Sequence, residues 1–302
     1  MSHNLKKPSF LKTGDKIGIV STARKISLDE LRFAIRELES WGLEVVLGKT
    51  IGLSHDQFAG SDIERANDLQ EMMDSPDIKA IFCARGGYGT VRIMEHLDFT
   101  GFTKDPKWLI GYSDVTILHA QLNNYLGIQS LHATMPINYE SNSAESLLSL
   151  KNSLWGITES FQFESHSLNK NGQAEGLVIG GNLSILYSIL GTSSGFNPDH
   201  KILFIEDLDE YLYHIDRMMM ALKRAGKLSN LKGLIVGGMT KMNDNTVPFG
   251  KSTEEIVLEH CGEFGYPICF QAPIGHLDDN RALVFGKNYT LEINATSVKI
   301  SS

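Results

Sequence analysis

Three side chains capable of hydrolytic chemistry stand where buried strands are expected to end. Ser113 follows the apolar segment Trp-Leu-Ile-Gly-Tyr, Glu206 closes Lys-Ile-Leu-Phe-Ile, and His276 follows Cys-Phe-Gln-Ala-Pro-Ile-Gly. A serine, a histidine and a carboxylate can act as nucleophile, general base and orienting group. In open α/β sheets, ligands and reactive groups gather beyond the carboxyl ends of the strands. The three residues are far apart in the sequence, so only the tertiary fold could bring them together.

The segment Gly111-Tyr-Ser-Asp114 stands between an expected strand and an expected helix. A serine on such a tight turn exposes its hydroxyl group, and the free N–H groups of the helix start suit a developing oxyanion. The usual Gly-x-Ser-x-Gly elbow lacks its last glycine here, because Val115 takes that place. The alternative is that Ser113 or Asp114 only caps the helix.

The segment Arg85-Gly-Gly-Tyr-Gly89 also lies between a strand and a helix. It is similar to a dinucleotide-binding loop, but Arg92 stands where the third glycine of that fingerprint is required. Three interpretations remain open. The glycines permit a tight turn, the loop donates a backbone N–H beside Ser113, or the loop binds a phosphate.

Glu206 and His276 each have a simpler interpretation. Glu206 begins the acidic run 206–210, which could be a solvated stretch that caps a helix, and His276 is one of ten histidines. Against this, a carboxylate directly after an apolar strand would reach a partly buried site, and loops such as 273–280 often carry function. No His, Cys and carboxylate grouping has a metal-binding spacing, so we predict neither a metal nor a cofactor.

Strand and helix signals alternate through the chain, which predicts an α/β fold with a mostly parallel sheet. Capping-box patterns at Ser27–Glu30 and Ser61–Glu64 open two of the expected helices. Expected strands include 15–21, 42–47, 78–84, 108–111, 176–181 and 201–206. The pattern weakens near 140–170, so we predict an N-terminal domain over 1–150, a linker or crossover over 151–172 and a C-terminal domain over 173–302.

Composition narrows the class of protein. Hydrophobic residues make up 42% of the 302 residues and charged residues 21%, as in a globular protein that is not embedded in a membrane. A net charge of −8 argues against non-specific nucleic-acid binding. No signal peptide or long apolar span is visible, and three cysteines without paired spacing fit a reducing compartment. We therefore predict a cytoplasmic protein that binds neither nucleic acid nor membrane.

Several blocks of this sequence, in one order, resemble the LD-carboxypeptidase family of serine peptidases. That family includes the muramoyltetrapeptide carboxypeptidases and the microcin C self-immunity peptidases. The blocks are FAGSDIERANDLQEMMDSPDIKAIFCARGGYGTVRIMEHLDF (58–99), KWLIGYSDVTILH (107–119), IGGNLSILYSILGT (179–192), KILFIEDLDEYLYHIDRMMMALKRAG (201–226) and PIGHLDDN (273–280).

The resemblance implies a two-domain homodimer. Its N-terminal domain would be a Rossmann-like parallel sheet and its C-terminal domain a β-rich α/β unit, with the active site between them. The family's nucleophile, triad carboxylate and base fall on Ser113, Glu206 and His276. The backbone N–H groups of Gly87 and Asp114 would form the oxyanion hole.

For an enzyme of this family we expect removal of the terminal D-alanine from a murein tetrapeptide, as in cell-wall recycling. Arg85 could hold the terminal carboxylate of the substrate, and Tyr88 or Tyr112 could stack against it. The alternatives are cleavage of a peptidyl-nucleotide antibiotic and, from another class, a non-catalytic nucleotide- or sugar-binding module. Many relatives read His-Gly-Pro-Met where this chain has His132-Ala-Thr-Met135, a difference that could reshape the pocket wall.

Overall fold

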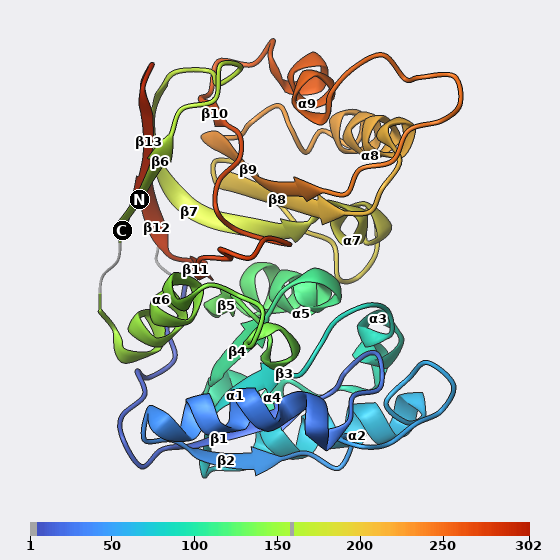
Figure 1. Ribbon diagram of the computed structural model, residues 1–302, viewed down its shortest axis with the longest axis vertical. Coiled ribbons are helices and arrows are strands. Elements are labelled where there is room, and N and C mark those ends of the chain that lie inside the picture. Colours follow the sequence, from blue (N-terminus) through green and yellow to red (C-terminus); the bar gives the residue numbers. More distant parts are fainter. Residues whose placement is uncertain (1–4, 158–159) are drawn as a thin grey trace.

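The computed structural model describes residues 5–157 and 160–302, which form two α/β units stacked one above the other (Figure 1). Each unit is built on its own β-sheet, with six strands in the first and seven in the second. The predicted α/β class is confirmed. Helix α5, Thr116–Ala120, lies at the junction of the two units, directly after the segment that carries Ser113.

The first sheet has the strand order β11-β5-β4-β3-β1-β2. Its five N-terminal strands are parallel, whereas β11 is antiparallel to β5. The strand bounds are β1 Lys16–Val20, β2 Glu44–Leu47, β3 Ile78–Cys83, β4 Trp108–Gly111, β5 Ser130–His132 and β11 Leu283–Phe285. Nearly every residue of β1, β3 and β4 is buried, as expected for central strands covered on both faces.

Local sequence signals explain where the longer helices of the first unit begin. Both predicted capping boxes are present, with Ser27 bonding Glu30 at the start of α1 and Ser61 bonding Glu64 at the start of α2. The helices are α1 Leu28–Ser40, α2 Asp62–Asp74, α3 Thr90–Ile93, α4 Thr100–Lys104, α5 and α6 Ala144–Trp155, with short turns at Met94–His96, Ser113–Val115, Gln121–Tyr125 and Pro136–Asn138.

The second sheet has the order β10-β9-β8-β7-β12-β13-β6. Strands β7 to β10 pair in parallel, and the other three add an antiparallel edge. The bounds are β6 Ser160–Glu164, β7 Gly172–Asn182, β8 Ile202–Leu208, β9 Gly233–Thr240, β10 Ile268–Cys269, β12 Asn288–Ile293 and β13 Ser297–Ser301, with helices α7 Leu183–Ser188, α8 Leu212–Arg224 and α9 Thr253–Cys261. This mixture accounts for the β-rich character expected of the C-terminal half.

Two details of the structure differ from the prediction. The segment 151–172, expected to be a linker, holds the end of α6 and the edge strand β6, whose apolar side chains alternate with polar ones; residues 158–159 lie outside the described residues. Glu206 does not close its strand, since β8 continues to Leu208. The domain boundaries at 150 and 173 themselves stay a prediction.

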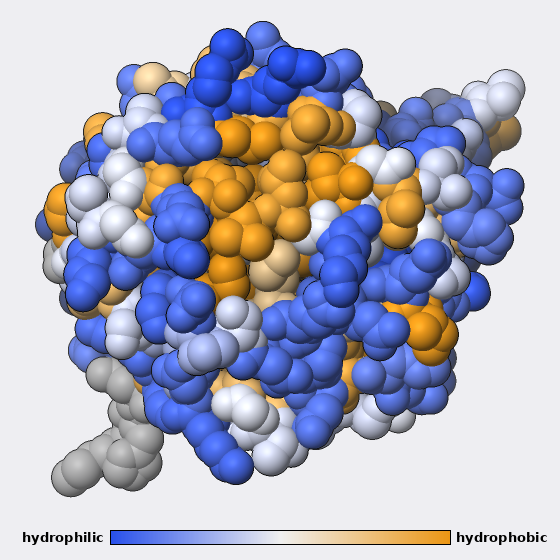
Figure 2. Space-filling model, turned by 90° about the horizontal axis from the view of Figure 1, so that it is seen from below, coloured by the Kyte–Doolittle hydropathy of each residue, from blue (hydrophilic) through white to orange (hydrophobic). Residues whose placement is uncertain are grey.

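The edge strand β2 leaves apolar side chains at the surface. Seen from below the first sheet, an apolar patch is bordered by hydrophilic residues (Figure 2). Val45 and Val46 of β2 are half-buried and Leu47 is exposed. An unpaired strand edge with apolar neighbours is a surface that commonly contacts other chains.

Candidate active site

Ser113 lies in a strained backbone conformation directly after β4. Its φ is +62°, which is the left-handed region that side chains with a Cβ rarely adopt. The neighbouring Tyr112 is extended, with φ −151°, so the chain reverses sharply between the two residues. This turn holds the Ser113 side chain at the carboxyl end of β4. Such strain persists only where the surrounding structure fixes it, and it is frequent at active sites.

The glycine loop 85–89 lies against Ser113. A Cβ atom at Gly86 would come within 3.1 Å of Ser113 Cβ and 3.2 Å of Ser113 Oγ, which is tighter than most Cβ contacts, so the glycine eases the close approach of the loop. The next residue, Gly87, has φ +111°. The loop therefore has the position that one interpretation of the sequence required, beside the serine.

Glu206 and His276 form a buried carboxylate–imidazole pair. The distance from His276 Nδ1 to Glu206 Oε2 is 2.6 Å, and the backbone N–H of His276 donates to the same oxygen at 3.3 Å. Glu206 has no solvent exposure. The pairing of β8 with β9 shifts register between Ile205 and Asp207, and such an irregularity at Glu206 re-aims a side chain within a strand.

The charge of Glu206 controls the protonation of His276. Burial by itself lowers the pKa of this imidazole, but the nearby carboxylate and its hydrogen bond outweigh burial, so the pKa is raised above its ordinary value. Bonding of Nδ1 to the carboxylate also fixes the tautomer, which leaves Nε2 as the proton acceptor of the neutral ring. His276 is thus prepared to act as a base above its raised pKa.

Tyr112 connects the serine turn to the histidine. Its ring packs edge-on against the His276 ring, with centroids 4.7 Å apart, and its hydroxyl donates to Asn138 Oδ1 at 3.1 Å. Since Ser113 follows Tyr112 directly, this ring contact brings the serine turn of the first unit near the histidine of the second unit. No hydrogen bond joins Ser113 to His276 within residues 5–157 and 160–302. A pocket of about 490 Å³ opens beside Tyr112 and His276, and its lining also includes Asn138 and Lys241.

Asp114 caps helix α3, whereas the sequence suggested that it could cap the helix that follows Ser113. Its buried carboxylate accepts a hydrogen bond from the Thr90 N–H at 2.8 Å, at the start of α3. Burial raises the pKa of this carboxyl, while Thr90 and the charge of Arg65 partly oppose that rise. The bond ties the serine turn to the end of the glycine loop.

Arg85 and Tyr88 have positions that sequence reasoning could not give. The Arg85 guanidinium donates to the Lys25 carbonyl oxygen at 3.1 Å and lies 4.0 Å from Glu30. Tyr88 is exposed and packs against Phe58, with ring centroids 6.0 Å apart. Arg85, Tyr88 and Tyr112 were expected to bind substrate. Within the described part of the chain, Tyr112 is the one of these three whose side chain contacts His276.

Residues outside the predicted site hold the histidine loop in place. Asn280 is fully buried and its Oδ1 accepts from the Gly275 N–H at 2.7 Å. Thr240 donates to the His276 carbonyl oxygen at 3.0 Å, and Asn142 donates to the Leu277 carbonyl oxygen at 2.9 Å. Asn280 lies four residues after His276 in the segment PIGHLDDN (273–280). This short spacing was the sequence signal that could have identified Asn280 as a residue of the site.

Gly275 is required by the approach of Glu206 to the histidine loop. Its φ is +110°, and a Cβ there would lie 2.8 Å from Glu206 Oε2. We expect Gly275→Ala to lower turnover at least about tenfold and to cost about 1–3 kcal/mol of unfolding free energy, because the added methyl group strains the backbone and overlaps the Glu206 carboxylate. Peptidase assays and thermal unfolding measure the two effects.

The matched control for this substitution is Gly265→Ala. Gly265 has no positive φ, and a Cβ there would meet no atom within 4 Å. Equal behaviour of the two alanine variants would contradict the role given to Gly275.

Metal-binding groups and membrane-spanning helices are two further features that bear on the class of protein. No group of three or more His, Cys, Asp or Glu side chains in residues 5–157 and 160–302 could hold a metal ion. In the same part of the chain, no helix is long and apolar enough to span a membrane.

A serine at a strained turn of the first unit and a buried histidine–glutamate pair of the second unit are the components of a serine hydrolase site. Comparison with known proteins narrows this class. Residues 17–133 match the LD-carboxypeptidase N-terminal domain, and residues 175–291 match the LD-carboxypeptidase C-terminal domain. The chain therefore belongs to the LD-carboxypeptidase family and is a serine-type carboxypeptidase, a hydrolase.

Individual relatives are similar to this chain over most of their length. A probable murein peptide carboxypeptidase of Bacillus subtilis is 36% identical over 93% of this chain and 89% of its own. The murein tetrapeptide carboxypeptidase of Pseudomonas aeruginosa is 30% identical over 92% and 94%. The crystal structure of the muramoyltetrapeptide carboxypeptidase from Oxalobacter formigenes superposes with a TM-score of 0.86 at 27% identity, covering 95% of this chain and 98% of that one.

A relative named for another role is also similar to this chain. The microcin C7 self-immunity protein of Escherichia coli is 29% identical over 75% of this chain and 76% of its own. Family membership by itself therefore does not choose between the two substrate classes that the sequence left open.

Proposed function

We propose that the protein hydrolyses the LD-peptide bond that releases the terminal D-alanine from murein tetrapeptides. The observation that carries this proposal is the Glu206–His276 pair placed against the Ser113 turn. The two murein peptide carboxypeptidases are more similar to this chain than the microcin C7 self-immunity protein is. The reaction would serve peptidoglycan recycling.

In the proposed mechanism, His276 Nε2 takes the proton of Ser113 Oγ as the hydroxyl attacks the carbonyl carbon before D-alanine. The bond to the amine breaks, and His276 returns the proton to the departing amino group. Water then repeats the sequence on the acyl-enzyme and releases the shortened peptide. Glu206 holds the tautomer and stabilises the imidazolium form, as its 2.6 Å hydrogen bond and complete burial support.

The oxyanion would be stabilised by the backbone N–H groups of Gly87 and Asp114. The close approach of Gly86 to Ser113 supports the first donor, and the helix-like turn at Ser113–Val115 supports the second. Removing one such donor typically costs about 10²–10³ in turnover.

The alternative within the family is a peptidase that cleaves a peptidyl-nucleotide antibiotic. The exposed Tyr88, packed on Phe58, offers an aromatic surface at the edge of the glycine loop and is the observation that keeps this alternative open. The non-catalytic binding module is disfavoured, because the chain matches both domains of a peptidase family.

Mass spectrometry of the purified protein with tri-, tetra- and pentapeptide murein fragments tests the proposal. We expect loss of one D-alanine from the tetrapeptide and no release from the tripeptide or the pentapeptide. A panel of aminoacyl sulfamoyl nucleosides serves as the comparison. Cleavage of these compounds with no release from any murein fragment would overturn the murein proposal.

Two further expectations, one from the composition of the sequence and one from the family resemblance, stay proposals. The chain would act in the cytoplasm, and it would form a homodimer. The apolar surface beside the edge strand β2 supports contact with a second copy (Figure 2).

A further inference from the structure

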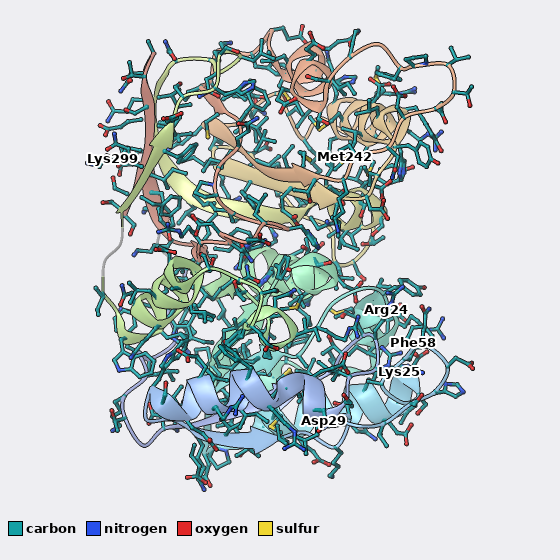
Figure 3. All side chains as sticks on the ribbon, viewed as in Figure 1. Arg24, Lys25, Asp29, Phe58, Met242 and Lys299 are labelled. Atoms are coloured by element: carbon teal, nitrogen blue, oxygen red, sulfur yellow. The ribbon has the colours of Figure 1, made fainter. Side chains whose placement is uncertain are left out.

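Arg24 lies closer to the serine turn than its place in the sequence suggests. It follows β1 and pairs with Phe58 in a short antiparallel bridge, which puts it in the same wall as the glycine loop. Figure 3 shows Arg24 and Phe58 together on the side of the molecule where α3 lies. A Cβ atom at Gly87 would come within 2.6 Å of Arg24 Cδ and 2.9 Å of Arg24 Nε. The arginine stem therefore lies flat on Gly87.

This contact relates the guanidinium to the reacting atoms. Gly86 is the residue whose Cβ would meet Ser113 Oγ at 3.2 Å, and Gly87 is the next residue. The Arg24 side chain thus lies beside Gly87, and the Ser113 side chain lies beside Gly86. The two side chains therefore flank adjacent residues of the same glycine loop.

Arg24 is exposed and has no recorded ion pair or side-chain hydrogen bond with any residue in the described part of the chain. Arg85, the arginine expected from the sequence, is different because it donates to the Lys25 carbonyl oxygen and lies near Glu30. A cation that already has an acceptor and a nearby carboxylate is less suited to a ligand. Arg24 retains its donors for a second molecule.

We propose that Arg24 binds the terminal carboxylate of the substrate. The inference rests on the proposed function and gives it a specificity-determining residue. A planar guanidinium can donate two parallel hydrogen bonds to a carboxylate, and such charge-assisted pairs are among the stronger polar contacts. A carboxypeptidase must distinguish the free end of a peptide from an internal bond, and a free guanidinium on the glycine loop that lies against Ser113 would provide that distinction.

The experiment compares two substrates with several variants. The substrates are a murein tetrapeptide with a free terminal carboxylate and the same peptide with a terminal carboxamide. For the wild type we expect kcat/KM to fall about 10²-fold on amidation, because a hydrogen-bonded charge is lost. Arg24→Met keeps the apolar stem on Gly87 but removes the charge. We expect it to cleave the free acid about 10²-fold more slowly than the wild type and the amide at the wild-type rate.

Two further variants make the result specific. Lys25→Met removes the neighbouring cation, whose Nζ donates to Ser54 Oγ at 3.2 Å, and it should retain the wild-type ratio. Arg24→Lys should recover part of the discrimination, since an ammonium group keeps the charge without the planar fork. Thermal unfolding of Arg24→Met should match the wild type, because the exposed side chain forms no recorded polar contact within the described chain.

The possible outcomes separate this inference from the proposed function. If the wild type discriminates and Arg24→Met does so equally, the inference is wrong while the reaction stands. The same holds if Lys241→Met loses the discrimination instead, since Lys241 lines the pocket beside His276. A wild type that cleaves neither peptide would overturn the proposed reaction and, with it, the role of Arg24.

Discussion

Ser113→Ala is expected to reduce D-alanine release by at least about 10⁴-fold, because the attacking oxygen is removed and only binding and oxyanion stabilisation remain. The fold should persist, since alanine occupies the left-handed backbone region about as unfavourably as serine does. Release of D-alanine from a murein tetrapeptide, followed by mass spectrometry, measures the loss. An Ala variant with wild-type turnover would show that the nucleophile is another group.

The strain at Ser113 supplies a second readout for the same position. With φ at +62°, Ser113→Gly should unfold at a higher free energy than the wild type by about 1 kcal/mol, while being as inactive as the alanine variant. Denaturant unfolding tests this prediction. A glycine variant that is less stable than the wild type would mean that the turn stores no strain. A Ser113→Gly variant that is more stable but less active than the wild type would show that the strained conformation of Ser113 serves catalysis at the expense of stability.

Glu206→Gln is expected to lower turnover by about 10³–10⁴-fold. The amide has nearly the same shape but carries no charge, and its NH₂ group favours the wrong tautomer of His276. Kinetics at saturating and at low substrate should show the loss mainly in kcat. The matched control is Glu210→Gln, because Glu210 Oε2 and His214 Nδ1 form a similar 2.6 Å pair outside the site. Equal losses in the two variants would contradict the role of Glu206.

The pH dependence of the same variant has a definite sign. In the wild type the pKa of His276 is raised, so kcat/KM should fall as the pH drops through that raised value and the base becomes protonated. Glu206→Gln removes the carboxylate charge but leaves the burial, so the pKa of His276 should fall and the acid limb should move to lower pH. If the acid limb of the kcat/KM profile stays at the same pH in Glu206→Gln, the group that titrates there is not His276.

Stability should respond in the same direction. A histidine whose folded pKa is raised contributes stability that is fully present below its unfolded pKa and is lost as the pH rises through the folded pKa. The wild type should therefore gain stability over Glu206→Gln as the pH is lowered towards 6. Thermal unfolding between pH 5 and 9 measures this difference.

Sequence reasoning succeeded where the signal was local. The capping boxes at Ser27 and Ser61 formed as predicted because each needs only residues three positions apart. The serine turn after β4 was also found, since an apolar strand followed by small polar residues is visible in one short window. Its positive φ was not visible, because a left-handed backbone conformation at a residue other than glycine has no sequence signature.

Features that depend on distant residues were missed or misplaced. The register shift in β8 places Glu206 inside the strand, and it follows from pairing with β9. Asp114 caps α3 because the tertiary fold brings the Thr90 N–H to it. Arg24 carries no motif, and only the packing of its stem on Gly87 reveals it. Each of these depends on contacts between segments that are separated in the sequence.

Strand β11 has a consequence for how the chain is made. Residues 283–285 pair with β5 and complete the first sheet, although every other strand of that sheet lies before residue 133. During synthesis, the edge of β5 stays open until residues 283–285 have left the ribosome. An unpaired edge of this kind can join another chain. Until β11 emerges, the first unit therefore carries two unpaired sheet edges, β5 and β2, rather than the one that remains at β2 in the folded protein.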